Sequence, residues 1–198
     1  MEYIEGGDLS NYIFSKKRLT ENIACNFFRQ LISVIEYLSE MKISHRDIKA
    51  ENILLDFSHK KIKVIDFGLS NYCSSNELLK STCGSPYYIS PEILLNLPYK
   101  GINIDLWTSG IVLYLMLCGS FPFNDNEITH LYERIKLGDF TLPSYLSLEA
   151  IDLIKKILQI NPDNRISIND IKKHSWFNLE KTPMYKGINI NKEAISYD

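Results

Sequence analysis

The chain has 198 residues, of which 45% are hydrophobic and 23% are charged, a composition typical of a soluble globular domain. A formal net charge of −2 without a basic stripe argues against nucleic acid as a partner. The longest apolar run, residues 111–118, is too short to span a membrane, and the acidic start is unlike a signal peptide. Four cysteines without CxxC spacing indicate free thiols, so we expect an intracellular protein, cytoplasmic or nuclear, with no membrane partner.

The predicted elements are mostly helices. Apolar residues at helical spacing predict a first helix that ends near Met41, with Thr20 as its N-cap. Two short β-prone runs, 53–56 and 61–65, predict a hairpin, whereas residues 66–92 have almost no periodicity. Further helices are predicted over 103–118, 127–137, 147–158 and 167–173. We therefore expect a mainly α domain with one small β-hairpin, that is, an α+β fold.

The hairpin gathers polar residues of the segment HRDIKAEN, residues 45–52. Asn52 immediately precedes the first strand and Asp66 follows the second, and paired antiparallel strands lie about 5 Å apart. An amide oxygen and a carboxylate suit Mg²⁺, which often completes its ligand shell with phosphate. Asp47 lies on the loop before Asn52, and Lys49 can neutralise charge on a transferred phosphoryl group. The spacing therefore predicts metal-assisted phosphoryl transfer.

These motifs resemble those of protein kinases. HRDIKAEN is similar to the kinase catalytic loop, and DFG at 66–68 is similar to the metal-binding motif. The segments SPE, IDLW and PDNR follow in the kinase order, and the lysine two residues after Asp47 resembles serine/threonine kinases. Three positions depart from the usual pattern, because Ile48 replaces leucine, Ala50 replaces proline and Ser90 replaces alanine.

The longer segments 66–92 and 118–147 resemble one kinase group in particular. This is the AMP-activated and sucrose-non-fermenting group within the calcium/calmodulin-dependent kinase superfamily. The resemblance implies a serine/threonine protein kinase that transfers the γ-phosphate of ATP, with Mg²⁺, to Ser or Thr of protein substrates. It covers only the large, C-terminal lobe of a kinase.

The resemblance also implies a role for each residue of the polar cluster. Asp47 would accept the proton of the substrate hydroxyl, and Lys49 would contact the γ-phosphate. Asn52 and Asp66 would hold Mg²⁺. The ATP-contacting residues would be Glu2, Ile4, Asp8, Glu51, Leu54, Ile65 and Asp66. Within this set, main-chain groups of Glu2 and Ile4 would bond adenine, with Leu54 and Ile65 beneath it.

Further residues would support the site structurally. Asp105 would bond backbone amides of the catalytic loop, and Glu92 with Arg165 would form a buried ion pair. His45 and Phe67 would stack on each other in the core. Taken singly, these features have simpler explanations: a surface charge run, an ordinary turn, a helix N-cap at Asp105 and a surface ion pair. Their joint order and the hairpin geometry favour the kinase interpretation.

Regulation and substrate choice are also implied by the resemblance. Ser81 occupies the position that an upstream activating kinase would phosphorylate, with Thr82 beside it as the alternative. Arg46 would then bind the added phosphate. Asp8 would meet a basic residue upstream of the phosphoacceptor, whereas Leu115 replaces an acid that reads a second arginine in some relatives. Regulatory subunits are further expected partners.

The sequence contains no glycine-rich loop and no lysine-bearing strand. We expect residues 1–8 to be a hinge, with Met1 at the gatekeeper position, 9–177 to be the C-terminal lobe, and 178–198 to be a polar tail that could begin a regulatory segment. Weak Mg-ATP binding and poor transfer are expected of such a chain alone. Three interpretations stay open: an incomplete copy of an active kinase, an impaired lobe acting as a binding module, and a degenerate copy without function.

Overall fold

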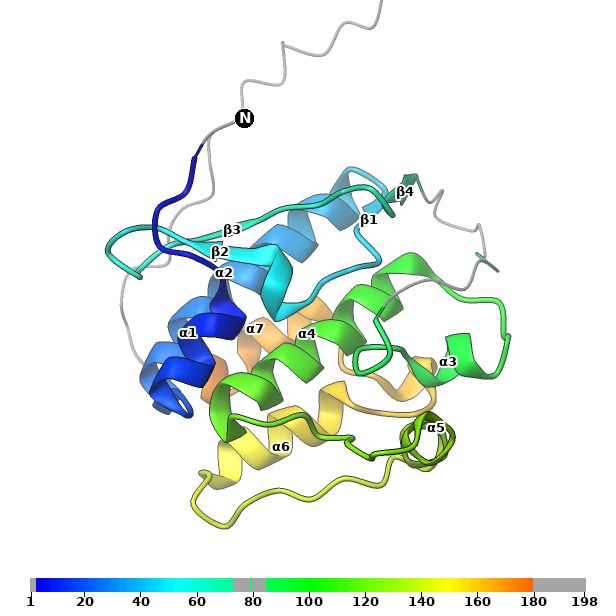
Figure 1. The fold of residues 1–198 in the computed structure, drawn as a ribbon. Helices are drawn as coiled ribbons and strands as arrows, with labels where there is room; N and C mark the ends of the chain where they lie inside the picture. Colours follow the sequence, from blue (N-terminus) through cyan, green and yellow to red (C-terminus); the bar gives the residue numbers. More distant parts are fainter. Residues whose placement is uncertain (1–2, 73–78, 80–84, 180–198) are drawn as a thin grey trace, which may run out of the picture.

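The computed structural model describes residues 3–72, 79 and 85–179, which form a mainly helical domain with two small sheets (Figure 1). The α-helices are α1 Leu9–Lys16, α2 Glu21–Glu40, α3 Pro91–Leu94, α4 Gly101–Cys118, α5 Ile128–Leu137, α6 Leu148–Ile157 and α7 Ile168–Lys173. Short 3-10 helices are η1 Ala50–Asn52, η2 Pro162–Asn164 and η3 Trp176–Asn178. The strands are β1 Ile43–Ser44, β2 Ile53–Leu55, β3 Ile62–Val64 and β4 Asn71–Tyr72.

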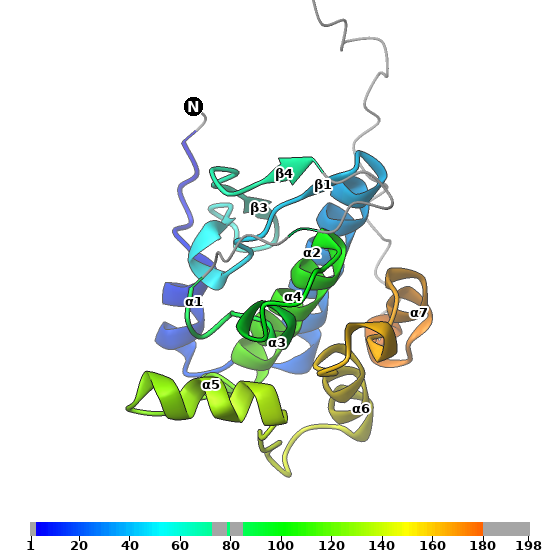
Figure 2. The same ribbon diagram turned by 90° about the vertical axis from the view of Figure 1, so that its right-hand side faces the viewer.

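Helix α4 lies at the centre of the domain, between α2 and α6 (Figures 1 and 2). Nearly all its residues are buried, because they are apolar on every side of the helix. Among the described residues, only α4 is long and apolar enough to cross a membrane, yet 83% of it is buried inside the fold, as in the core helix of a soluble protein. The helix is longer than the apolar run 111–118 of the sequence, because it begins ten residues earlier, at Gly101.

Helix α2 packs one face against α4, in agreement with its helical periodicity. Phe27, Leu31 and Ile35 are buried, but Ile23 is 39% exposed, so the predicted apolar stripe begins one turn too early. Thr20 is the N-cap residue, although its side chain makes no capping hydrogen bond. The core therefore forms where the apolar period predicted it, and only the first turn of α2 differs.

The predicted hairpin is present as β2 and β3, with Ile53 opposite Val64 and Leu55 opposite Ile62. Alternation turns Ile53, Leu55 and Val64 into the core and turns Leu54 to the other face of the sheet. Asp56 organises the turn, because its carboxylate accepts hydrogen bonds from the Ser58 hydroxyl and the backbone amides of Lys60 and Lys61. These bonds, led by that from Ser58, lower the pKa of Asp56 to about 2.

The segment before α1 lies along the hairpin. The Gly6 amide donates to the Leu55 carbonyl at 3.0 Å, and the Leu55 amide donates to the Gly7 carbonyl at 2.9 Å. A Cβ atom at Gly6 would overlap the carbonyl oxygens of Leu55 and Asp56, so glycine is needed for this close approach. The expected hinge is thus hydrogen-bonded to the carboxyl end of β2.

Two further features were not predicted from the sequence. Helix α1 follows the N-cap Asp8, and the two-residue strands β1 and β4 pair antiparallel, with Ile43 opposite Tyr72. The β1–β4 pair joins the end of α2 to the irregular segment 66–92. Part of that segment is therefore regular structure, too short to leave a pattern in the sequence.

A buried ion pair joins α3 to the segment that ends η2. The Arg165 guanidinium donates to both oxygens of Glu92, at 2.9 and 3.2 Å, and both side chains are 1% exposed. Arg165 also donates to the carbonyls of Asn103 and Gln159 and lies over the Trp107 ring. The surface-pair alternative for Glu92 and Arg165 is therefore wrong.

Breaking this pair from one side should be costly. Arg165→Met leaves the Glu92 carboxylate buried without a partner, so we expect the free energy of unfolding to fall by about 3–5 kcal/mol. The double variant Glu92→Leu/Arg165→Met should lose much less than the sum of the two single changes. Urea unfolding of the four proteins measures this coupling.

Arg134→Met is the matched control, because Arg134 pairs with Asp139 at 3.2 Å on the surface. Its loss should cost no more than about 1 kcal/mol. Equal losses for Arg134→Met and Arg165→Met would contradict the assignment of Glu92–Arg165 as a stability-determining pair.

Candidate active site

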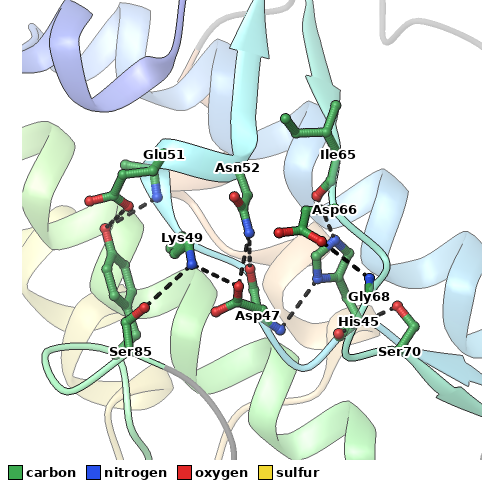
Figure 3. A network of polar contacts seen from close by, with 12 residues as sticks. His45, Asp47, Lys49, Glu51, Asn52, Ile65, Asp66, Gly68, Ser70 and Ser85 are labelled. Carbon is green, nitrogen blue, oxygen red and sulfur yellow. Dashed lines mark hydrogen bonds and ion pairs between the residues drawn. The ribbon is translucent and has the colours of Figure 1, made fainter. Parts of the chain in front are cut away.

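The segment 45–52 runs from β1 to β2 and directs the side chains of Asp47, Lys49 and Asn52 toward one another (Figure 3). Asp47 is buried, and its Oδ2 accepts from Lys49 Nζ at 2.7 Å and from Asn52 Nδ2 at 3.0 Å. No hydrogen bond reaches its Oδ1 within the part of the chain that the structure describes. Asp47 thus has one carboxylate oxygen fixed by two donors and one oxygen that receives no donor among the described residues.

Asn52 and Asp66 lie at the same end of the β2–β3 hairpin (Figure 3). Asn52 Nδ2 donates to both the carbonyl and the Oδ2 of Asp47, each at 3.0 Å, and this fixes the amide orientation with its oxygen directed away from Asp47. The Asp66 carboxylate is exposed and accepts from the Gly68 amide at 3.2 Å.

An amide oxygen and one accessible carboxylate are the donor types that suit Mg²⁺. Among the described residues there is no group of three or more His, Cys, Asp or Glu side chains that could enclose a metal. This sparse donor set fits an ion that takes much of its shell from phosphate and water. The side chains of Asn52 and Asp66 therefore fit the expected Mg²⁺ site.

The His45 ring contacts both Asp47 and the residue after β3, Ile65. The Asp47 amide donates to Nδ1 at 3.3 Å, and Nε2 lies 3.1 Å from the Ile65 carbonyl, so these contacts select the Nε2–H tautomer. The rings of His45 and Phe67 are 4.7 Å apart, as expected. Phe67 is 47% exposed, however, so its placement in the core was wrong, because no described segment covers its outer face.

Asp105 fixes the start of the segment 45–52 by hydrogen bonds. Its carboxylate accepts from the amides of His45 at 2.9 Å and Arg46 at 2.8 Å and from the Ser44 hydroxyl at 2.9 Å. Asp105 is inside α4, whose N-cap is Lys100, so the alternative N-cap role is wrong. Burial raises the pKa of Asp105, while the bonds from Arg46, His45 and Ser44 act in the opposite direction.

Two basic residues extend from the loop toward the irregular segment. Lys49 Nζ lies 3.4 Å from the Ser85 hydroxyl, and Arg46 Nε donates to the Leu69 carbonyl at 2.7 Å. Arg46 thus contacts the first half of the segment 66–92. The candidate phosphorylation positions Ser81 and Thr82 lie outside the described residues.

The residues expected to contact ATP lie along the hairpin, from Glu51 before β2 to Ile65 after β3, with the expected hinge beside the carboxyl end of β2. Leu54 and Ile65 are half-buried, and strand alternation places them on the face opposite the core. Ile4 is half-buried, whereas Glu2 and Met1 lie outside the described residues. Leu54 and Ile65, the expected nucleotide floor, are therefore only partly covered by the described residues.

Two acidic residues that are expected to contact ATP already make hydrogen bonds within the fold. The Asp8 carboxylate caps α1, accepting from the Asn11 amide at 2.8 Å and from Asn11 Nδ2 at 2.6 Å. The Glu51 carboxylate accepts from the Tyr88 hydroxyl at 3.1 Å. Glu51 itself lies in η1, between Lys49 and β2. Leu115, which replaces an acid of some relatives, is buried in α4.

Sequence reasoning missed three contributors to the site. Ser44 bonds Asp105, Ser85 lies beside Lys49, and Tyr88 contacts Ala50 and Glu51. Ser44 lies in a two-residue strand, and Ser85 and Tyr88 lie in an irregular segment, so no periodic signal marks them and only their neighbours in space reveal them. The single sequence clue was Ala50, which departs from the usual proline.

Asp105→Asn should destabilise the fold, because an amide presents a donor where the carboxylate accepts three hydrogen bonds. We expect the free energy of unfolding to fall by about 1–3 kcal/mol in urea titrations. Asp163→Asn, an exposed change in η2, should stay within about 0.5 kcal/mol of the parent. An Asp105→Asn protein as stable as the Asp163→Asn control would refute the supporting role.

Comparison with known proteins agrees with this geometry. The protein kinase domain family matches residues 1–177. The chain is 46% identical over 188 residues to the SNF1-related protein kinase catalytic subunit alpha KIN12 of Arabidopsis thaliana, and 45% identical to the carbon catabolite-derepressing protein kinase of Secale cereale. Each match covers 95% of this chain but 37% of the relative, so the chain spans little more than a third of these proteins. The chain belongs to the protein kinase family and is similar to its SNF1-related serine/threonine members.

Proposed function

We propose that this chain supplies the catalytic loop and metal site of a serine/threonine protein kinase, which transfers the γ-phosphoryl group of ATP to protein Ser or Thr hydroxyls. The observation that carries the proposal is the state of Asp47: one oxygen is fixed by Lys49 and Asn52, and the other is available. A second candidate, a binding module without catalysis, follows if this geometry proves inactive.

The residues present divide the reaction between them. The substrate hydroxyl oxygen forms a bond to the γ-phosphorus, the bond to the β–γ bridging oxygen breaks, and ADP leaves. The hydroxyl proton passes to Asp47 Oδ1. Lys49, held 2.7 Å from Asp47, places a positive charge beside the transferred group. Asn52 and Asp66 would hold Mg²⁺, which neutralises charge on the phosphates when bound.

We further propose the partners that the resemblance implies. Substrates would carry a basic residue upstream of the phosphoacceptor, facing Asp8, and an upstream kinase would phosphorylate Ser81 or, less favoured, Thr82. Arg46, which already contacts the segment 66–72, would bind that phosphate. One relative is named a catalytic subunit, which supports a role for regulatory subunits. Cys25 and Cys118 form no disulfide among the described residues, which supports an intracellular location.

Transfer of labelled phosphate from Mg-ATP to a serine peptide tests the proposed reaction. We expect the 198-residue chain to react slowly, well below the 1–100 s⁻¹ that is typical of kinases, because its sequence contains no glycine-rich loop to cover the phosphates. Asp47→Asn removes the proton acceptor and should lower the residual rate by about 100-fold or more.

Chelation of Mg²⁺ should likewise abolish transfer, whereas Asp163→Asn should leave it unchanged. Transfer that persists in the Asp47→Asn protein would show that the activity comes from elsewhere. In that case the binding-module alternative would be preferred.

Asp8→Asn tests substrate choice without disturbing α1, because asparagine is an equally good N-cap. The parent chain should phosphorylate a peptide with an upstream arginine about fivefold better than its alanine counterpart, as one exposed ion pair allows. The Asp8→Asn protein should lose this preference, measured as the ratio of the two kcat/KM values. Equal phosphorylation of both peptides by the parent would contradict the proposed arginine preference.

A further inference from the structure

We propose that Tyr88 is a positioning residue, whose hydroxyl joins the end of the segment 66–92 to the backbone and side chain of the catalytic loop. The proposal rests on the proposed kinase function, and it names a contact that the motifs do not contain. The hydroxyl oxygen lies 3.1 Å from the Ala50 amide and 3.1 Å from Glu51 Oε2.

The direction of the two hydrogen bonds follows from the groups themselves. The Ala50 amide can only donate and the Glu51 carboxylate can only accept, so the hydroxyl accepts from Ala50 and donates to Glu51. Burial and the nearby charge of Glu51 raise the pKa of Tyr88, which keeps the hydroxyl protonated and able to donate. The two bonds run in series, and each polarises the other.

The contact depends on the residue type at position 50. Proline, which is usual there, has no backbone N–H and would place its ring in front of the nitrogen, where the hydroxyl lies. Lys49 is extended, with φ −153° and ψ 159°, a conformation that a residue before proline adopts readily. The backbone would therefore accept proline, and alanine matters because it supplies a donor.

Tyr88 is itself held firmly. Its ring is 4% exposed and packs edge-on against Phe121 with the centroids 5.3 Å apart. Its amide donates to the Ser85 carbonyl, and the following Ile89 carbonyl accepts from Trp107 Nε1 at 3.1 Å. A rigid Tyr88 thus fixes Ser85 and Ile89 relative to Ala50, three residues beyond the base Asp47. Ser85 lies 3.4 Å from Lys49, which contacts Asp47, so we expect loss of the Tyr88 hydroxyl to disturb a peptide bound beside Asp47 more than a bound nucleotide.

Amide hydrogen exchange and peptide kinetics together test this role in the full chain. Tyr88→Phe should speed exchange of the Ala50 amide by about 5- to 10-fold, as expected when one hydrogen bond is lost. It should also raise the peptide KM by about fivefold, while the KM for ATP and kcat change by less than about twofold.

The neighbouring Tyr87→Phe is the matched control. Tyr87 stacks on the same Phe121 ring, and its hydroxyl makes no hydrogen bond among the described residues. This change should alter neither the exchange nor the peptide KM. In an Ala50→Pro background, where the amide donor is missing but the Glu51 acceptor remains, Tyr88→Phe should raise the peptide KM by clearly less than it does in the parent chain.

Three results would overturn the proposal. They are an unchanged Ala50 exchange rate in Tyr88→Phe, faster exchange without any change in the peptide KM, and a full effect of Tyr88→Phe in the Ala50→Pro background. A wild-type chain without phosphotransfer would contradict the proposed function, and with it the positioning role. The exchange measurement, made without ATP, would then still report whether the hydrogen bond itself exists.

Discussion

The site depends on one buried carboxylate. Asp105 accepts hydrogen bonds from two consecutive amides, those of His45 and Arg46, and this requires Arg46 to adopt a left-handed conformation with φ 64°. That conformation costs a non-glycine residue about 1–2 kcal/mol, which the hydrogen bonds to a charged acceptor offset. This turn lies between β1 and Asp47 and brings the Asp47 side chain to the end of the hairpin, beside Asn52.

Much of this architecture could be predicted from the sequence, because it is written in periodic patterns and fixed spacings. The apolar periods gave the positions of α2, α4, α5, α6 and α7 within a few residues. The positions of Asn52 and Asp66 on either side of two β-prone runs were enough to place them together, since a hairpin leaves few alternatives. Asp47, Lys49 and Asn52 then had to be neighbours, being two to five residues apart on one loop.

The remaining features depend on contacts between distant segments. Strands β1 and β4 have two residues each, so no alternation can appear, and they are set by the path of the chain around the site. Phe67 was placed in the core by resemblance, yet its exposure depends on what packs against it rather than on its own type. The Tyr88 hydroxyl joins residues 37 and 38 positions away, and no local pattern reports that pairing.

Residues in the first turns of α4 fix the positions of three separate segments around the site. The Asn103 carbonyl accepts from Arg165, the Asp105 carboxylate accepts from the His45 amide, and Trp107 Nε1 donates to the Ile89 carbonyl. Three alternate residues thus fix the positions of three segments along the axis of α4. With a rise of 1.5 Å per residue, these anchors span only about 6 Å along the helix axis. One inserted or deleted residue here would turn the later anchors by about 100°. The spacing between Asp47 and the segment beside it is thus set by the number of residues in these turns of α4.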